Sequence, residues 1–167
     1  MTQRVDLATV MDRLAVDAVV TGYAVAVDDG DWTAYRGLFT RDGRADYRSA
    51  GGIEGPAAEV ADWLAETMQM FPVRQHLIVN RRITLEDAGG SPGDRAEVLA
   101  DFVNPMRLTG AADPSTAPNF VAGGRYTFAL ARTYDGWRLR RVTVAERWRH
   151  FAAAGPDGQA RPDGPTL

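Results

Sequence analysis

The sequence predicts an α+β fold: a cone-shaped α+β barrel in which three N-terminal helices pack on a strongly curved, mostly antiparallel sheet that encloses a pocket. Apolar residues recur every three or four positions in the N-terminal part of the chain, and every two positions from about residue 74 onward. Helices followed by hairpin-linked strands are typical of α+β architecture. With 167 residues, we expect one domain over residues 1–152 and a flexible tail over 153–167, which is rich in Gly and Pro.

The first predicted helix begins after Asp6, a capping residue, and ends at Gly30. Its apolar stripe is broad and includes Leu7, Val10, Met11, Leu14, Ala18, Val25 and nearby positions. A second helix is expected over 31–39, a short strand over 43–49, and a third helix over 54–71.

Four strands are predicted after the helices, at about 74–85, 95–106, 119–132 and 137–149. The sequence Tyr-Asp-Gly at 134–136 predicts a tight hairpin turn between the last two. The apolar alternation of the last strand changes phase around Arg140 and Arg141, which predicts a β-bulge and added curvature.

Composition excludes several classes of function. The net charge is −3 without a basic block, so nucleic acid is not an expected partner. No apolar run approaches the roughly 18 residues of a membrane span. The absence of cysteine excludes thiolate chemistry and agrees with a cytoplasmic protein. With only His76 and His150, a three-histidine metal site within one chain is impossible, and no metal is expected.

Three residues form the leading candidate for a catalytic site. His76 can accept a proton near neutral pH, and a carboxylate would fix its tautomer. Asp28 lies in the last turn of the first helix, where an acid is unfavourable for the helix dipole. Tyr23 precedes it by five residues, so the two share a helix face only loosely. The alternatives are a strand histidine bonded to a backbone carbonyl and a solvated helix end at Asp28.

Further polar and apolar residues are candidates for ligand binding. Tyr47 can donate a hydrogen bond to a ligand, or it can simply pack. Four polar residues of the later strands either bind ligand or lie on an exposed sheet face: Asp101, Asn104, Arg125 and Arg147. Which of Asp101 and Asn104 faces the pocket stays open. Candidate apolar walls are Trp63, Met68, Met70, Phe71 and Phe120.

The chain resembles the SnoaL-like branch of the nuclear transport factor 2-like superfamily over residues 5 to about 150. The segments that carry the resemblance are GYAVAVDDGDWTAYRGLFTRDGRADY, EVADWL, RQHLIVN and YDGWRLRRV. Within that branch it is similar to scytalone dehydratases, bile-acid 7α-dehydratases and lindane dehydrochlorinases. The resemblance implies catalytic roles for Tyr23, Asp28, Tyr47 and His76. Ala24 stands where scytalone dehydratases have an Asp, so scytalone itself is not the expected substrate.

The resemblance also implies a function. We expect a lyase of the dehydratase type that needs no metal or organic cofactor and acts on a small hydrophobic cyclic substrate, such as a polyketide, steroid or terpenoid. An Asp-His general base would work with tyrosine hydrogen-bond donors. The alternatives are an isomerase or cyclase that uses the same pair, or a non-enzymatic module for ligand binding or dimerisation. A homodimer or homotrimer is expected.

Overall fold

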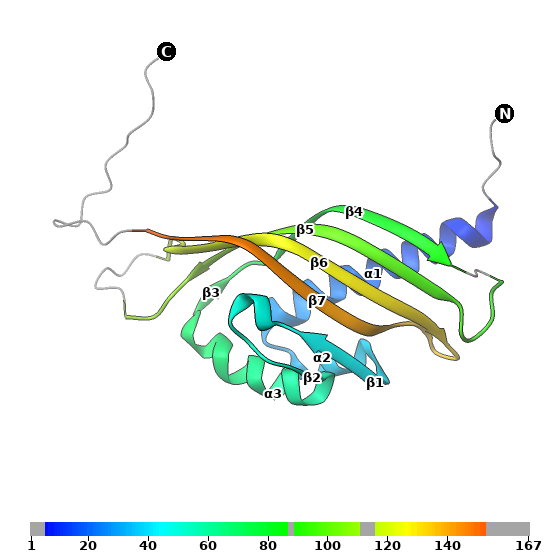
Figure 1. Cartoon of the computed structure of the whole chain (residues 1–167), viewed down its shortest axis with the longest axis horizontal. Coiled ribbons are helices and arrows are strands. Elements are labelled where there is room, and N and C mark those ends of the chain that lie inside the picture. Colours follow the sequence, from blue (N-terminus) through cyan, green and yellow to red (C-terminus); the bar gives the residue numbers. More distant parts are fainter. Residues whose placement is uncertain (1–5, 87–88, 111–115, 153–167) are drawn as a thin grey trace, which may run out of the picture.

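The structure is a computed structural model, and it is described over residues 6–86, 89–110 and 116–152. The predicted tail, 153–167, lies outside these residues. Within them, three α-helices pack on one side of a curved seven-stranded sheet (Figure 1). The helices are α1 (Leu7–Asp29), α2 (Trp32–Gly37) and α3 (Ala57–Thr67). The predicted α+β fold is confirmed, but the sheet stays open and does not close into a barrel.

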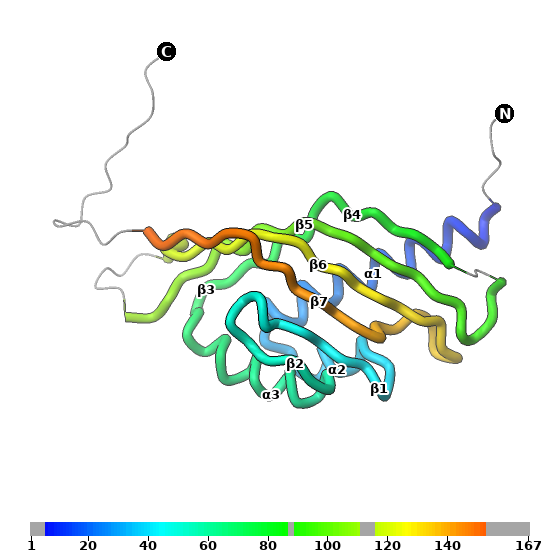
Figure 2. The backbone as a smooth tube through the Cα atoms, viewed as in Figure 1, coloured from blue at the N-terminus to red at the C-terminus, as the bar shows by residue number. Residues whose placement is uncertain are grey.

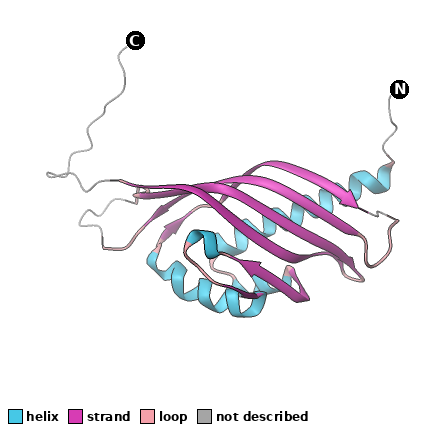
Figure 3. Cartoon of the chain, viewed as in Figure 1, coloured by secondary structure: helices cyan, strands magenta, loops and turns pink. Residues whose placement is uncertain are grey.

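The sheet has the strand order β2-β1-β7-β6-β5-β3, and β4 also pairs with β5. The strands are β1 (Phe39–Asp46), β2 (Glu54–Pro56), β3 (Val73–Arg74), β4 (Leu77–Glu86), β5 (Arg95–Arg107), β6 (Phe120–Thr133) and β7 (Gly136–Phe151). Only the pairing of β1 with β7 is parallel among the described strands. The three long strands β5, β6 and β7 run side by side as arcs over the helices (Figures 2 and 3). Two short 3₁₀ turns, η1 (Arg48–Ala50) and η2 (Met68–Met70), complete the described elements.

The ends of α1 are those predicted, but its buried face is not. The Asp6 carboxylate accepts a hydrogen bond from the Thr9 amide, and Gly30 ends the helix in the left-handed conformation. The predicted stripe is largely exposed, with Leu7 75% and Leu14 60% accessible. The buried residues are Val16, Val20, Tyr23, Ala24, Ala26 and Val27. The predicted and the observed buried residues both have helical spacing, but they differ by about two positions, which is roughly 200° of rotation around the helix. The face of α1 that packs on the sheet is therefore nearly opposite to the predicted one.

Two irregularities bend β7. Ala129 pairs with Arg141 and Leu130 with Leu139, which leaves Arg140 as an extra residue. This confirms the bulge predicted around Arg140 and Arg141. A second register shift leaves Arg147 without a partner on β6. Bulges bend a strand and increase its twist, so these two help the sheet to curve around the helices.

The predicted strand over 74–85 is interrupted at His76. β3 ends at Arg74 and β4 begins at Leu77, so His76 lies in a two-residue gap between two strands that both pair with β5. The amide of His76 donates to the carboxylate of Asp28 instead of to a neighbouring strand, at 2.8 and 3.1 Å from the two oxygens. The helix carboxylate thus supplies the acceptor for an amide that points away from β5.

The start of the predicted third helix also differs. Glu54–Pro56 forms the edge strand β2, and the helix itself begins at Ala57. None of the described helices is long and apolar enough to cross a membrane.

Candidate active site

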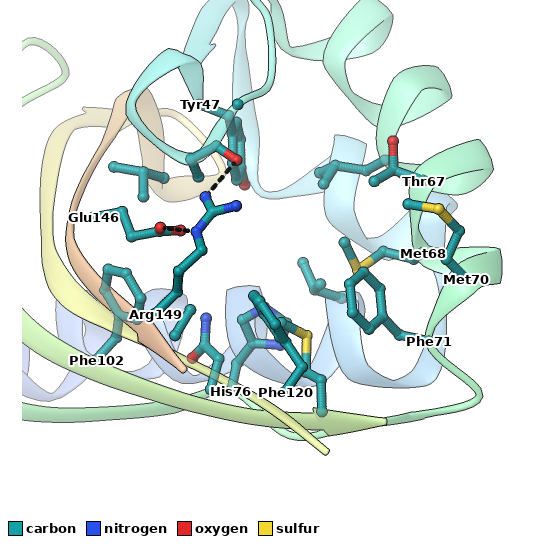
Figure 4. A pocket seen from close by; sticks show the side chains of 18 of the residues that line it. Tyr47, Thr67, Met68, Met70, Phe71, His76, Phe102, Phe120, Glu146 and Arg149 are labelled. Carbon is teal, nitrogen blue, oxygen red and sulfur yellow. Dashed lines mark hydrogen bonds and ion pairs between the residues drawn. The ribbon is translucent and has the colours of Figure 1, made fainter. Parts of the chain in front are cut away.

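A cavity of about 300 Å³ lies between the helices and the sheet. Its walls come from α1, α3, the two 3₁₀ turns and the inner faces of β5, β6 and β7. The lining is mostly apolar and includes Trp63, Met68, Met70, Phe71 and Phe120, all five of the residues predicted as walls. In the close view, Met68, Met70 and Phe71 form one side, and Glu146 and Arg149 lie opposite (Figure 4). Such a cavity suits a small, largely hydrophobic ligand.

His76 and Asp28 meet at the floor of this cavity. Nδ1 of His76 lies 2.6 Å from Oδ1 of Asp28, and the histidine side chain is only 7% exposed. The backbone amide of His76 binds the same carboxylate, so Asp28 is held by both the ring and the main chain of one residue. Nε2 has no hydrogen-bond partner among the described residues. The carboxylate thus favours the tautomer with the proton on Nδ1, which leaves Nε2 as the free proton acceptor.

Arg74 holds the end of α1 that carries Asp28. Its Nε donates to the carbonyl oxygens of Val27 and Asp28, at 3.0 and 2.9 Å, and its Nη1 donates to that of Met68. A side chain at Gly30 would place its Cβ 2.8 Å from Nη2 of Arg74. Carbonyl groups at a helix C-terminus lack helical partners, and a guanidinium there also offsets the unfavourable position of an acid. Arg74 therefore fixes the helix end from which Asp28 reaches His76.

Two tyrosine hydroxyls meet in the wall of the cavity that His76 also lines. Tyr23, on α1, is hydrogen-bonded through its hydroxyl to that of Tyr47, which follows β1. Burial raises the pKa of both phenols well above the usual value of 10. Burial also raises the pKa of the neighbouring Tyr126 to about 12. These phenols therefore stay protonated at any working pH, and they can donate a hydrogen bond or a proton but cannot act as bases.

The four polar strand residues divide between the two faces of the sheet. Asn104 is 5% exposed and lines the cavity. The other three do not line it, so the structure offers no contact between them and a ligand in this cavity. Asp101 forms an ion pair with Arg125 at 2.7 Å, and both side chains are about one-third exposed. Arg147 is exposed. Asp101 and Arg125 lie one position out of phase with the buried residues of β5 and β6, and neighbouring positions of a strand face opposite sides.

Glu146 and Arg149 line the cavity although the sequence did not single them out. Nε of Arg149 lies 2.5 Å from the carboxylate of Glu146, and Nη2 donates to the carbonyl oxygen of Ala50 at 3.2 Å (Figure 4). Glu146 continues the inward alternation of Val142 and Val144, which is a readable signal. Arg149 reaches the same side only because the bulge at Arg147 shifts the phase, and the sequence carries no clear signal of this bulge.

The arrangement combines one proton acceptor with several neutral donors in an apolar chamber. An imidazole backed by a carboxylate can remove a proton from carbon or oxygen. Phenols nearby can stabilise the negative charge that develops on an oxygen, or protonate a leaving group. Exclusion of water strengthens both effects.

Relatives with related sequences and folds agree with this architecture. The uncharacterized protein Rv2910c of Mycobacterium tuberculosis is 31% identical over 137 residues, which span 81% of this chain and 86% of the relative. The crystal structure of LinA matches with a TM-score of 0.74 at 18% identity, covering 90% of this chain and 95% of LinA. A candidate scytalone dehydratase from Novosphingobium aromaticivorans gives 0.70 at 18% identity, covering 92% and 98%. At these low identities the structural matches show a shared fold.

The family assignment rests on a match over most of the chain. The SnoaL-like domain family matches residues 8–143, which include α1, the His76 gap and the first half of β7. This chain therefore belongs to the SnoaL-like domain family.

Proposed function

We propose that this protein is a cofactor-independent lyase of the dehydratase type that acts on a small hydrophobic cyclic substrate. The observation that carries the proposal is the 2.6 Å contact between Asp28 and His76 at the floor of an apolar cavity. In support, two of the similar folds are named as a dehydrochlorinase and a candidate dehydratase, and both names denote eliminations.

In the proposed reaction, Nε2 of His76 removes a proton from a carbon next to the bond that breaks. The Asp28 carboxylate stabilises the imidazolium that forms. The hydroxyls of Tyr23 and Tyr47 stabilise the developing oxyanion or donate a proton to the departing oxygen. When a hydroxyl group leaves as water, His76 gains one proton and one tyrosine gives one up, and return of a proton from the imidazolium to the phenolate restores the site. The same groups would serve an isomerase or cyclase, in which the proton returns to another atom of the substrate.

A probe for elimination tests the base without knowledge of the natural substrate. With 5-nitrobenzisoxazole, removal of the ring C–H proton breaks the N–O bond and yields a coloured nitrophenolate, so turnover is read by absorbance. We expect the wild-type protein to catalyse this reaction, and His76→Gln to lower kcat/KM by about 100-fold, the usual contribution of a general base. Asp28→Asn should lower it by at least about tenfold, because the imidazolium loses its carboxylate.

The matched control is Asp101→Asn, which removes a carboxylate from the opposite face of the sheet. It should leave the rate of elimination unchanged. Turnover by His76→Gln at the wild-type rate would exclude His76 as the base. If the wild-type protein bound the probe but turned it over no faster than both site variants, the chain would be a ligand-binding module.

A further inference from the structure

Asn104 lies beside the proposed base on the cavity floor. The amide of Gln75 donates to the carbonyl oxygen of Pro105, and Leu77 pairs with Val103, so the gap residue His76 is level with Asn104. Both residues line the cavity. A ligand that reaches Nε2 of His76 therefore also meets the amide of Asn104.

The side chain of Asn104 offers a hydrogen-bond acceptor that the protein does not use. Its Oδ1 is buried and has no hydrogen-bond partner among the described residues. Tyr126 also lines the cavity, and the Asn104 side chain lowers the pKa of Tyr126 against the larger effect of burial. That direction is expected when the NH₂ group faces the phenol oxygen, which leaves Oδ1 as the free end of the amide.

A buried acceptor without a partner is costly because it has lost its hydrogen bonds to water, and a ligand that supplies a donor removes this cost. The other polar groups around the floor cannot relieve this cost from their present positions. The hydroxyls of Tyr23 and Tyr47 bind each other, and Arg149 is engaged by Glu146 and Ala50. The phenol oxygen of Tyr126 faces the NH₂ end of the amide, so its O–H is not directed at Oδ1. The missing donor must then come from the ligand.

We propose that Asn104 selects substrates that carry a hydrogen-bond donor, a ring hydroxyl or an N–H group, separate from the group that the tyrosines hold. The inference rests on the proposed function only in placing the ligand in the same cavity. The substrate is thus polar at two points: an oxygen that accepts from the phenols, and a hydroxyl or N–H that donates to Oδ1. A compound made only of carbon, hydrogen and halogen leaves Asn104 unpaired and binds poorly.

Paired naphthalenes test this selection by binding alone. 2-Naphthol carries a donor, 2-methoxynaphthalene has the same ring without one, and calorimetry at about pH 7 gives the Kd of each. We expect the wild-type protein to bind 2-naphthol about tenfold more tightly than the methyl ether, because the ether leaves Oδ1 of Asn104 without a hydrogen-bond donor. Asn104→Leu, which is similar in size and has no acceptor, should bring the two Kd values within about twofold of each other.

The controls separate this proposal from the lyase proposal. Asn104→Asp keeps an acceptor oxygen and should keep the preference for naphthol. If the Asn104→Leu variant does not fold, Asn104→Asp becomes the test. Loss of the preference in Asn104→Asp then counts against the proposal. His76→Gln should keep the preference and lose elimination of the benzisoxazole. An equal preference in wild type and Asn104→Leu overturns the role of Asn104, as does equal or absent binding of both compounds by the wild-type protein. A preference that depends on Asn104, without any catalysed elimination, refutes the lyase and leaves the selection intact.

Discussion

At Tyr23 and Tyr47, burial turns two ionisable side chains into fixed hydrogen-bond donors. Tyr23 is 1% exposed and packs edge-on against the rings of Tyr126 and Phe128. Because desolvation disfavours the phenolate, the pKa of each hydroxyl rises and the neutral form persists. The division of roles in the site follows from this, since the acceptor of protons must be the imidazole and the donors must be the phenols.

This division predicts an unusual alkaline titration. We expect no more than one of the five tyrosines to ionise by about pH 11 in the folded protein, measured from tyrosinate absorbance, because burial raises the pKa of Tyr23, Tyr35, Tyr47 and Tyr126. In denaturant all five should ionise near pH 10. Above about pH 10 the unfolded chain binds fewer protons than the folded one, so the free energy of unfolding should fall as pH rises. Ionisation of three tyrosines by pH 10.5 with the fold intact would contradict the donor roles.

Residue types and family resemblance point to Tyr23, Asp28 and His76, but they do not say which polar residues of the strands face the cavity. Tyr23 and His76 line one cavity, and the carboxylate of Asp28, which does not line it, contacts the ring of His76. For Asp101 and Asn104 the sequence left open which faces the cavity. The answer depends on the phase of β5 relative to the helices, which is a tertiary property that one strand does not encode.

At the level of elements, the curvature of the sheet depends on how closely β6 and β7 approach at their second bulge. Gly124 pairs with Glu146, next to the extra residue Arg147. A Cβ on Gly124 would lie 2.2 Å from the carbonyl oxygen of Ala145, which is main chain and cannot rotate away. Glycine is therefore required here by close backbone approach rather than by a positive φ angle.

Gly124→Ala should accordingly destabilise the protein by about 2–3 kcal/mol, the cost of forcing an extra methyl group into a packed region. The midpoint of urea unfolding measures the loss. Gly37→Ala is the control, because nothing lies within 4 Å of the added Cβ, and its stability should be unchanged or slightly higher. Equal midpoints for wild type and Gly124→Ala would show that the strands separate at this bulge without cost.

The turn and the bulge in the strand-rich part of the chain were easier to predict than the side of a helix that is buried. The turn at 134–136 and the bulge at Arg140 come from local rules of turn chemistry and alternation, and both are present. The buried face of α1 was predicted wrongly because that helix is apolar on two sides. Sequence periodicity cannot say which side the sheet will cover.

For the whole molecule, one consequence of an open sheet is that its outer face remains accessible. Val79, Val103 and Trp148 are each more than one-third exposed in this chain. The expected homodimer or homotrimer stays a prediction. The sheet encloses the cavity only because α1, α3 and the segment from Asp46 to Glu54 cover its inner face (Figure 1).

Asp46 ties together three parts of this assembly. It ends β1, its carboxylate accepts hydrogen bonds from Arg48 of η1 at 2.7 and 2.9 Å, and Arg141 of β7 lies 3.6 Å away. The Arg48 guanidinium lowers the pKa of the largely buried Asp46 carboxyl to about 2. An unfolded Asp ionises near pH 3.9, so the stability from this carboxylate is complete above about pH 4 and disappears as pH falls towards 2.

Asp46→Asn should therefore lower the urea midpoint of the whole molecule at pH 7 and pH 5 by the same amount. The difference from wild type should shrink as the pH is lowered from about 4 towards 2, because protonation removes the same charge from the wild-type protein. Asp62→Asn is the control, since the carboxylate of Asp62 is 74% exposed beside Arg36 and a surface pair of this kind contributes little. A difference between wild type and Asp46→Asn that is constant from pH 7 down to pH 2 would mean that the neutral amide fails for reasons of shape, and that the charge of Asp46 does not hold β1, η1 and β7 together.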